Sequence, residues 1–266
     1  MKIDTHAHIF LKNLPVINNA RYSPKYDASF EEYHSFLNSF GFQKAVLVQP
    51  SFLGTNNDFL LNSIKDNKNF KAIVVVDKNI SFEELQKLKE NGACGIRLNL
   101  LGQDFTDFKD KEWETLFHHI AKLKMQIEIQ RDLEDGLIDM LKTLLDFDCN
   151  IVIDHLARSS YIDSINLQKL LKLKNSKIFF KISGFYRAKF PYKNNQEAIK
   201  FAKEIYEILK KNFSLHNFVF GSDWPHTNFE NKIDFSSAFL AFEEIVASKK
   251  EREQILGDNA CTLFHF

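Results

Sequence analysis

The sequence predicts an α/β fold, a single-domain (β/α)8 barrel over residues 1–266, and three observations lead to it. Short apolar runs recur along the chain, a helical pattern follows each run, and eight such units fit into about 250 residues. The runs at 45–48 and 72–76 are apolar at every position, which is typical of strands buried on both faces of a parallel sheet. A doubly wound open sheet is the alternative, but no glycine-rich phosphate loop follows the first strand.

The predicted strands are the apolar runs, in chain order, at 2–9, 44–49, 71–76, 95–99, 125–130, 150–154, 177–183 and 217–222. Two of the helices between them begin with a capping box, at Ser29–Glu32 and at Ser81–Glu84, and they run to about residues 40 and 91. Further helical patterns cover about 56–66, 110–123, 134–147, 162–174, 195–212, 233–248 and 250–256. The long irregular segments at 11–28 and 184–195 follow strands, where loops are often functional.

The composition limits the possible partners. Lys and Arg number 35, as do Asp and Glu, so the net charge is 0 and an electrostatic nucleic-acid binder is not expected. No apolar run approaches the length of a membrane span, and since the first predicted strand begins at residue 2, a signal peptide of the usual form is not expected. The three scattered cysteines are expected to be reduced thiols. We therefore expect a cytoplasmic protein that acts on a small molecule, with no nucleic-acid or membrane partner.

Two histidines stand two positions apart on the first predicted strand. His6 and His8 point to the same face because side chains alternate along a strand. Two imidazoles aimed together can hold a metal ion or polarise a carbonyl oxygen. The sixth predicted strand ends at Asp154 and His155, and the eighth ends at Asp223. In a (β/α)8 barrel the carboxyl ends of the strands form the active site, so we expect these groups to converge.

The other predicted strands also end in polar residues. They are Gln49 to Ser51, Asp77, Arg97 with Asn99, Glu128 with Gln130, and Lys181 with Ser183. Such a concentration of polar groups at one end of apolar strands would be costly without a site to accommodate it.

Three motifs carry a family resemblance. They are Asp4-Thr5-His6-Ala7-His8, Ile153-Asp154-His155 and Gly221-Ser222-Asp223-Trp224-Pro225-His226. Together they resemble the amidohydrolase superfamily of the amidohydrolase 2 type, and more narrowly the 2-pyrone-4,6-dicarboxylate lactonase-like hydrolases. The match continues in order through 21–24, 48–51, 95–99 and 259–260, so it spans essentially the whole chain.

The resemblance implies a distorted TIM barrel that hydrolyses a small carboxylated lactone or a related ester. Asp223 would be the general base that deprotonates water. His6, His8 and His155 would surround the carbonyl oxygen and stabilise the oxyanion, or bind one divalent metal ion together with Asp223. Three histidines and one aspartate are suitable ligands for zinc. Because this branch also has members that work without a metal, a metal-independent site is an equal alternative. A two-metal centre is not expected, because Arg97 and Glu128 stand where it would need other ligands.

The expected substrate contacts come from several strand ends and loops. They are Tyr22, Ser51, Arg97, Glu128, Arg187 and His226. Arg97 has an alternative role as an internal ion-pair partner of Glu128. Gln103 and Glu128 replace an arginine and a tyrosine of the family pattern, which predicts a less acidic substrate than a dianionic pyrone. Arg131, Arg158 or Arg187 could restore one carboxylate contact.

Other functions remain possible from the sequence. A metal-dependent decarboxylase or hydratase of the same superfamily would need a tightly held ion. A metal-dependent nuclease or phosphoesterase on the same barrel is disfavoured by the neutral charge and by Arg97. A barrel that binds a small acid without turning it over is the non-enzymatic alternative.

Overall fold

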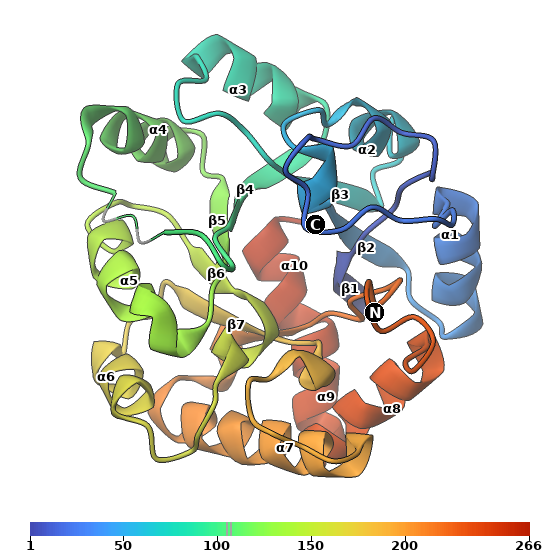
Figure 1. Ribbon diagram of the computed structural model, residues 1–266, viewed down its shortest axis with the longest axis vertical. Coiled ribbons are helices and arrows are strands. Elements are labelled where there is room, and N and C mark those ends of the chain that lie inside the picture. Colours follow the sequence, from blue (N-terminus) through green and yellow to red (C-terminus); the bar gives the residue numbers. More distant parts are fainter. Residues whose placement is uncertain (105, 107) are drawn as a thin grey trace.

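A computed structural model describes residues 1–104, 106 and 108–266, and its centre is one parallel sheet of eight strands in the order β1 to β8 (Figure 1). The strands are β1 (Ile3–Ala7), β2 (Lys44–Val48), β3 (Phe70–Val74), β4 (Ala93–Asn99), β5 (Gln126–Gln130), β6 (Ile151–Ile153), β7 (Ile178–Ile182) and β8 (Phe218–Phe220). Every neighbouring pair from β1 to β8 is parallel. All eight predicted strands are confirmed, and so is the (β/α)8 barrel.

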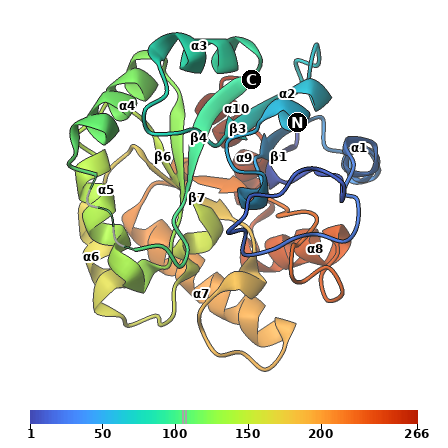
Figure 2. The same ribbon diagram turned by 45° about the horizontal axis from the view of Figure 1, so that its top comes forward.

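Helices surround the sheet on its outer side (Figure 2). They are α1 (Phe30–Ser39), α2 (Asp58–Ser63), α3 (Phe82–Glu90), α4 (Lys111–Lys122), α5 (Ile138–Leu144), α6 (Ile165–Leu173), α7 (Asn195–Asn212), α8 (Phe235–Ile245), α9 (Lys249–Leu256) and α10 (Asp258–Phe264). Ser29 caps α1 by accepting the amide of Glu32, and Ser81 and Glu84 form the predicted capping box of α3. The helix predicted over 134–147 is regular only from Ile138, because Gly136 has a left-handed φ of 77°.

The barrel closes between β8 and β1 through a short stretch after β8. The amide of Asp223 donates to the carbonyl of His6 at 2.8 Å, and the amide of His8 donates to the carbonyl of Trp224 at 2.7 Å. The buried carboxylate of Asp4 accepts the amide of Ser222 at 2.8 Å. These bonds distort the ring locally, and they place Asp223 directly beside His6.

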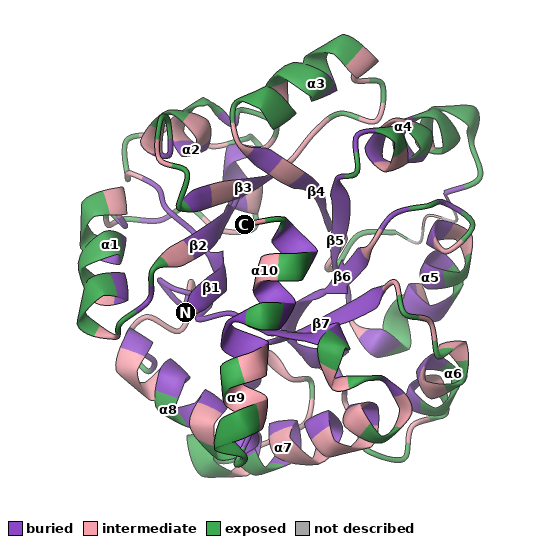
Figure 3. Cartoon of the chain, turned by 180° about the vertical axis from the view of Figure 1, so that it is seen from behind, coloured by how far each residue is buried: buried purple, intermediate pink, exposed green. Residues whose placement is uncertain are grey.

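The amino-terminal end of the barrel is covered by α10, which lies across the ring of buried strands when the molecule is seen from behind (Figure 3). Its apolar side chains Ala260, Leu263 and Phe264 form one buried cluster with Val46, Ile73, Val152 and Val219 of the strands. Lys71 donates to the carbonyl of Phe264 at 2.7 Å. The carboxyl ends of the strands are therefore left as the open end. Within the described part of the chain, no helix has both the length and the hydrophobicity needed to cross a membrane.

Candidate active site

A pocket of about 150 Å³ opens at the carboxyl ends of the strands. Seven of the ten predicted site residues line it: His8, Tyr22, Ser51, Arg97, His155, Arg187 and Asp223. The other three, His6, Glu128 and His226, are buried at 0%, 0% and 2% exposure behind this lining. His8 and Asp223, which are 215 positions apart in the sequence, thus line the same pocket.

The three histidines form a compact group. The ring centre of His6 lies 4.9 Å from that of His8 and 5.0 Å from that of His155. Nε2 of His6 lies 3.9 Å from Oδ1 of Asp223, and neither atom has a hydrogen-bond partner among the described residues although both are buried. Because unpartnered buried polar atoms are costly, this pair indicates a place for a water, a substrate oxygen or an ion.

Two glycines allow this close approach. A Cβ atom at Gly184, whose φ is 52°, would lie 2.6 Å from Nδ1 of His155 and 3.1 Å from Oδ2 of Asp223. A Cβ atom at Gly221 would lie 2.5 Å from the Cβ of His6. Any larger residue at either position would push the catalytic candidates apart.

The two oxygens of Asp223 have different surroundings. Oδ2 accepts Nε of Arg187 at 2.5 Å and the hydroxyl of Tyr186 at 2.7 Å, while Oδ1 faces His6. Burial by itself raises the pKa of Asp223, but Arg187, His155 and His6 outweigh it and hold the pKa below the ordinary value. The carboxylate is therefore ionised at neutral pH and is oriented by one oxygen.

His8 and His155 are both neutral. Burial lowers the pKa of each well below the ordinary value. For His8 the charges of His6 and Arg97 add to this effect, whereas for His155 the carboxylates of Asp223 and Asp154 oppose it without reversing it. Nδ1 of His8 lies 2.7 Å from the carbonyl oxygen of Val48, which can only accept, so the ring proton is on Nδ1. His8 consequently presents a lone pair on Nε2. Nδ1 of His155 contacts the hydroxyl of Ser183 at 2.9 Å, which permits either tautomer.

A buried charge cluster lies beneath His6. Lys181 contacts Glu128 and lies 2.9 Å from Nδ1 of His6, and Arg97 lies 3.4 Å from Asp154 and 3.9 Å from Glu128. Two cations thus balance two carboxylates out of water, as buried charges require. The prediction that Glu128 contacts the substrate is not supported by this placement. Glu128 lies two residues before the pocket-lining Gln130 on β5, so it is one layer deeper and fully buried.

Arg97 is placed where either of its two predicted roles is possible. It belongs to the buried cluster, and it also lines the pocket, where Nη2 donates to Oε1 of Gln130 at 2.8 Å. Nδ1 of His226 lies 2.9 Å from the hydroxyl of Tyr186, which donates to Oδ2 of Asp223. The backbone amide of His226 also donates to the carbonyl oxygen of Asp223 at 2.7 Å. Burial lowers the pKa of His226 to about 4.

The donor atoms fit one divalent metal ion. His6, His8 and Asp223 offer ligand atoms that all lie within 4.8 Å of one another, and His6, Asp154 and His155 form a second such group. The lone pair of His8 and the unpartnered Oδ1 of Asp223 are suitable ligands for zinc. The predicted four-residue set is thus divided between two overlapping groups that share His6.

Sequence reasoning left several residues of this region without a role. Arg21, Asn99 and Gln130 line the pocket, and Tyr186 orients Asp223. Asn99 and Gln130 could have been predicted as site residues, because both lie at predicted strand ends. Arg21 could not, because it lies in the long 11–28 segment, whose path cannot be predicted from the sequence.

Two arginines suggested as carboxylate contacts are engaged elsewhere. Nη2 of Arg131 lies 3.0 Å from the carboxylate of Asp135, and Nε of Arg158 lies 2.6 Å from that of Asp132. Of the three suggested arginines, the described pocket lining therefore includes Arg187 alone.

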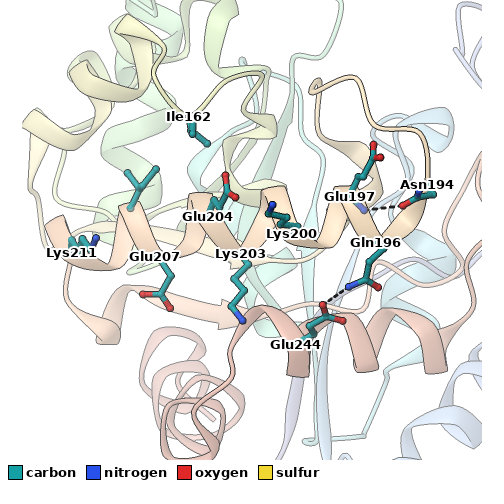
Figure 4. Close-up of a pocket in the computed structure, with 11 residues that line it drawn as sticks. Ile162, Asn194, Gln196, Glu197, Lys200, Lys203, Glu204, Glu207, Lys211 and Glu244 are labelled. Atoms are coloured by element: carbon teal, nitrogen blue, oxygen red, sulfur yellow. Dashed lines mark hydrogen bonds between the residues drawn. The ribbon is translucent and has the colours of Figure 1, made fainter.

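A larger groove of about 840 Å³ runs along α7, away from the strand ends (Figure 4). Charged side chains of both signs, among them Lys200, Lys203, Glu204 and Glu207, lie along it. Such a pattern is typical of a solvated helix face, so we place the chemistry at the strand ends, where buried unpartnered atoms converge.

The chain is similar to known proteins over essentially its whole length. The amidohydrolase family model matches residues 3–266. A probable 2-pyrone-4,6-dicarboxylic acid hydrolase of Acinetobacter baumannii, solved with citric acid bound, is 38% identical with a TM-score of 0.95, over 100% of this chain and 99% of that one.

Two curated relatives are lactone hydrolases by name. The 2-pyrone-4,6-dicarboxylate hydrolase of Comamonas testosteroni is 27% identical over 98% of this chain and 89% of its own length. The 4-sulfomuconolactone hydrolase of Hydrogenophaga intermedia is 24% identical over 98% and 88%. With the barrel, the strand-end site and the family match taken together, the chain belongs to the amidohydrolase family and is a hydrolase.

Proposed function

We propose that the protein hydrolyses a small carboxylated lactone, with Asp223 as the general base. The observation that carries the proposal is the buried, unpartnered pair of Asp223 Oδ1 and His6 Nε2, 3.9 Å apart, beside a pocket lined by arginines. The names of the relatives support the substrate class, since they act on a pyrone dicarboxylate and a sulfomuconolactone.

In the proposed reaction, water attacks the lactone carbonyl carbon while Oδ1 of Asp223 takes one of its protons. The lone pair of His8 can accept the other water proton as a hydrogen bond, which aims the oxygen at the carbonyl. Collapse of the tetrahedral intermediate breaks the ring C–O bond, and the proton held by Asp223 passes to the leaving oxygen. The products are one carboxylic acid, which ionises to a carboxylate and releases the second water proton to solvent, and one hydroxyl or enol on the same opened chain.

The oxyanion of the tetrahedral intermediate needs hydrogen-bond donors, and the three histidines differ in their ability to donate. Lys181 can only donate to Nδ1 of His6, and when it does so the proton of His6 is on Nε2, which then donates into the site. His8 cannot donate from Nε2 while it is neutral. We therefore assign oxyanion stabilisation to His6 and His155, where one well-placed donor contributes about 3–4 kcal/mol.

The second proposed form of the same site would contain a divalent ion, preferably zinc. His6, His8 and Asp223 would hold it, with His155 nearby, and it would supply Lewis-acid polarisation of the carbonyl. His6 would then carry its proton on Nδ1, facing Asp154 and Glu128 at 3.3 Å.

Substrate positioning falls to the residues around the rim of the pocket. Tyr22, Ser51 and Arg97 line it, and the guanidinium of Arg187 faces it beside Asp223. A planar guanidinium matches a carboxylate in bidentate geometry. We also propose a cytoplasmic location, which agrees with the three unpaired cysteines.

The test is a screen of carboxylated and sulfonated lactones, including 2-pyrone-4,6-dicarboxylate, with metal analysis of the same protein sample. Hydrolysis adds the mass of one water, whereas a decarboxylase would release carbon dioxide. Asp223→Asn should abolish turnover. Asp77→Asn, which changes an exposed aspartate that follows β3, is the matched control and should leave it intact. Unchanged turnover by Asp223→Asn would refute the general-base role.

A further inference from the structure

We propose that Arg21, together with the amide groups of Asn99 and Gln130, forms an anion subsite for a second carboxylate of the substrate, remote from the scissile carbonyl. The inference rests on the proposed function, and it names a feature of the substrate that the catalytic residues do not determine. Three observations carry it: the position of Arg21, the charges around it, and the free donors beside it.

Arg21 reaches across the mouth of the pocket. It belongs to the 11–28 segment after β1, which lies over the open end of the barrel (Figure 1), yet its guanidinium contacts the end of β4. Nη1 donates to the carbonyl of Leu101 at 2.6 Å, and Nη2 donates to Oδ1 of Asn99 at 2.8 Å. Both acceptors are neutral, and they fix the guanidinium in the pocket lining.

The charge of Arg21 is uncompensated. The other two arginines of the lining each have a carboxylate partner, Asp154 for Arg97 and Asp223 for Arg187. No carboxylate of the described residues lies within ion-pair distance of Arg21. The side chain of Arg21 is exposed at the mouth of the pocket; desolvation and the nearby positive charges of Arg97 and Arg158 lower its pKa, and the more distant Asp132 partly opposes this. An anionic ligand would relieve this excess of positive charge at the rim.

Asn99 accepts from Arg21, and Gln130 is the partner of Asn99 across β4 and β5; both amide groups have unused donors. Asn99 and Gln130 each turn their oxygen toward an arginine, which can only donate, so the amide nitrogen of each must face elsewhere. Neither nitrogen makes a hydrogen bond to another described residue. One cation and two neutral N–H donors that line the same pocket suit the oxygens of a carboxylate.

This subsite changes the expectation about substrate charge. Gln103 stands where the family pattern has a second arginine, which predicted a less acidic substrate. The carbonyl of Gln103 is bound by Arg131 at 3.1 Å, outside the described pocket lining. Arg21 supplies a cation from another segment, so the pocket can accept two carboxylates after all.

The alternative is that Arg21 only ties the 11–28 segment to β4. The two roles differ in their dependence on ligand charge. We would measure dissociation constants for benzene-1,3-dicarboxylate, a non-hydrolysable mimic of a pyrone dicarboxylate, and for benzoate, which lacks one carboxylate. The proteins would be the wild type, Arg21→Met, Arg21→Lys, Arg21→Gln and the control Lys25→Met, which removes an exposed charge from the same segment.

The preference for the dicarboxylate over benzoate should fall about tenfold or more in Arg21→Met and in Arg21→Gln, because a charge-assisted hydrogen bond is lost. It should persist in part in Arg21→Lys and fully in Lys25→Met. If Arg21→Met weakens both ligands by the same factor, or weakens neither, the subsite is refuted. Thermal melts verify that each variant is folded, and Arg21→Gln retains a donor toward Asn99 if Arg21→Met does not fold.

Turnover separates this inference from the proposed function. With a dicarboxylated lactone, Arg21→Met should raise KM about tenfold and change kcat less than about twofold, because the contact is remote from the reacting atoms. An Arg21-dependent preference in a protein that hydrolyses no lactone would refute the proposed function and keep the subsite. Hydrolysis with an unchanged KM in Arg21→Met would refute the subsite and keep the function.

Discussion

Arg187 holds one oxygen of Asp223 at 2.5 Å and thereby leaves the other oxygen free, 3.9 Å from Nε2 of His6. The same contact fixes the direction of the carboxylate and keeps it ionised. A general base for water needs both properties, since it must be deprotonated and must present a lone pair toward the attacking oxygen.

Arg187→Met should therefore lower kcat and shift the acid limb of the pH–rate profile. Arg187 lowers the pKa of Asp223, so its removal raises that pKa, and activity is lost at a higher pH, by about one unit or more. Arg158→Met, which breaks the separate pair with Asp132, is the control and should leave the profile in place. An unshifted acid limb in Arg187→Met would contradict this role.

Gly184→Ala should reduce activity far more than Gly102→Ala. Both glycines have positive φ, 52° and 69°, so either alanine adds backbone strain of about 1 kcal/mol. Only the Cβ at position 184 meets His155 and Asp223, whereas nothing lies within 4 Å of a Cβ at 102. Chemical unfolding measures the backbone strain in each variant, and steady-state kinetics measures the effect of displacing His155 and Asp223. Equal activity losses would show that the contact with His155 does not matter.

Lys181→Met should destabilise the fold by about 3–5 kcal/mol, because it removes one of the two cations and leaves the buried carboxylates of Glu128 and Asp154 to share Arg97. The double variant Lys181→Met/Glu128→Gln restores the charge balance and should recover a large part of the loss. Urea unfolding of the single and double variants measures this coupling. Additive losses would mean that the two side chains do not compensate each other.

His226 should make stability fall as the pH is lowered below its unfolded value. Burial lowers the pKa of His226 to about 4, so between pH 6.5 and 4 the unfolded state binds more protons than the native state. The contribution is complete above about pH 6.5, and about 2 kcal/mol of it is lost by pH 5. His226→Gln should thus show a shallower decrease in unfolding free energy from pH 7.5 to 5 than the wild type. Parallel curves for the two proteins would refute the assignment.

Added zinc should stabilise the wild type but not His8→Gln. The lone pair of His8 and Oδ1 of Asp223 are the ligands expected to bind it, and an ion that binds only the native state raises Tm in proportion to the logarithm of its concentration. His118→Gln removes an exposed histidine on α4 and serves as the control. If His8→Gln and the wild type respond alike, the ion binds elsewhere.

The sequence by itself determined the barrel and most of the residues at its open end. Apolar runs at regular spacing require a parallel sheet, and the period of two along a strand places Arg97 with Asn99 and Glu128 with Gln130 on one face. That period does not predict how deep in the barrel each of these side chains lies. Whether Glu128 or Gln130 reaches the pocket depends on the register of β5 against β4 and β6, which only the tertiary structure decided.

Contacts between distant segments were likewise decided only by folding. The tautomer of His8 follows from the carbonyl of Val48 on β2, and the orientation of Asp223 follows from Arg187 and Tyr186 after β7. The 11–28 segment has no repeating hydrophobic pattern, so its sequence does not predict that Arg21 lies beside Asn99. Hydrogen bonds between neutral loop groups and a guanidinium have short range and specific geometry, and they form only once the barrel has brought β1 and β4 to the same mouth.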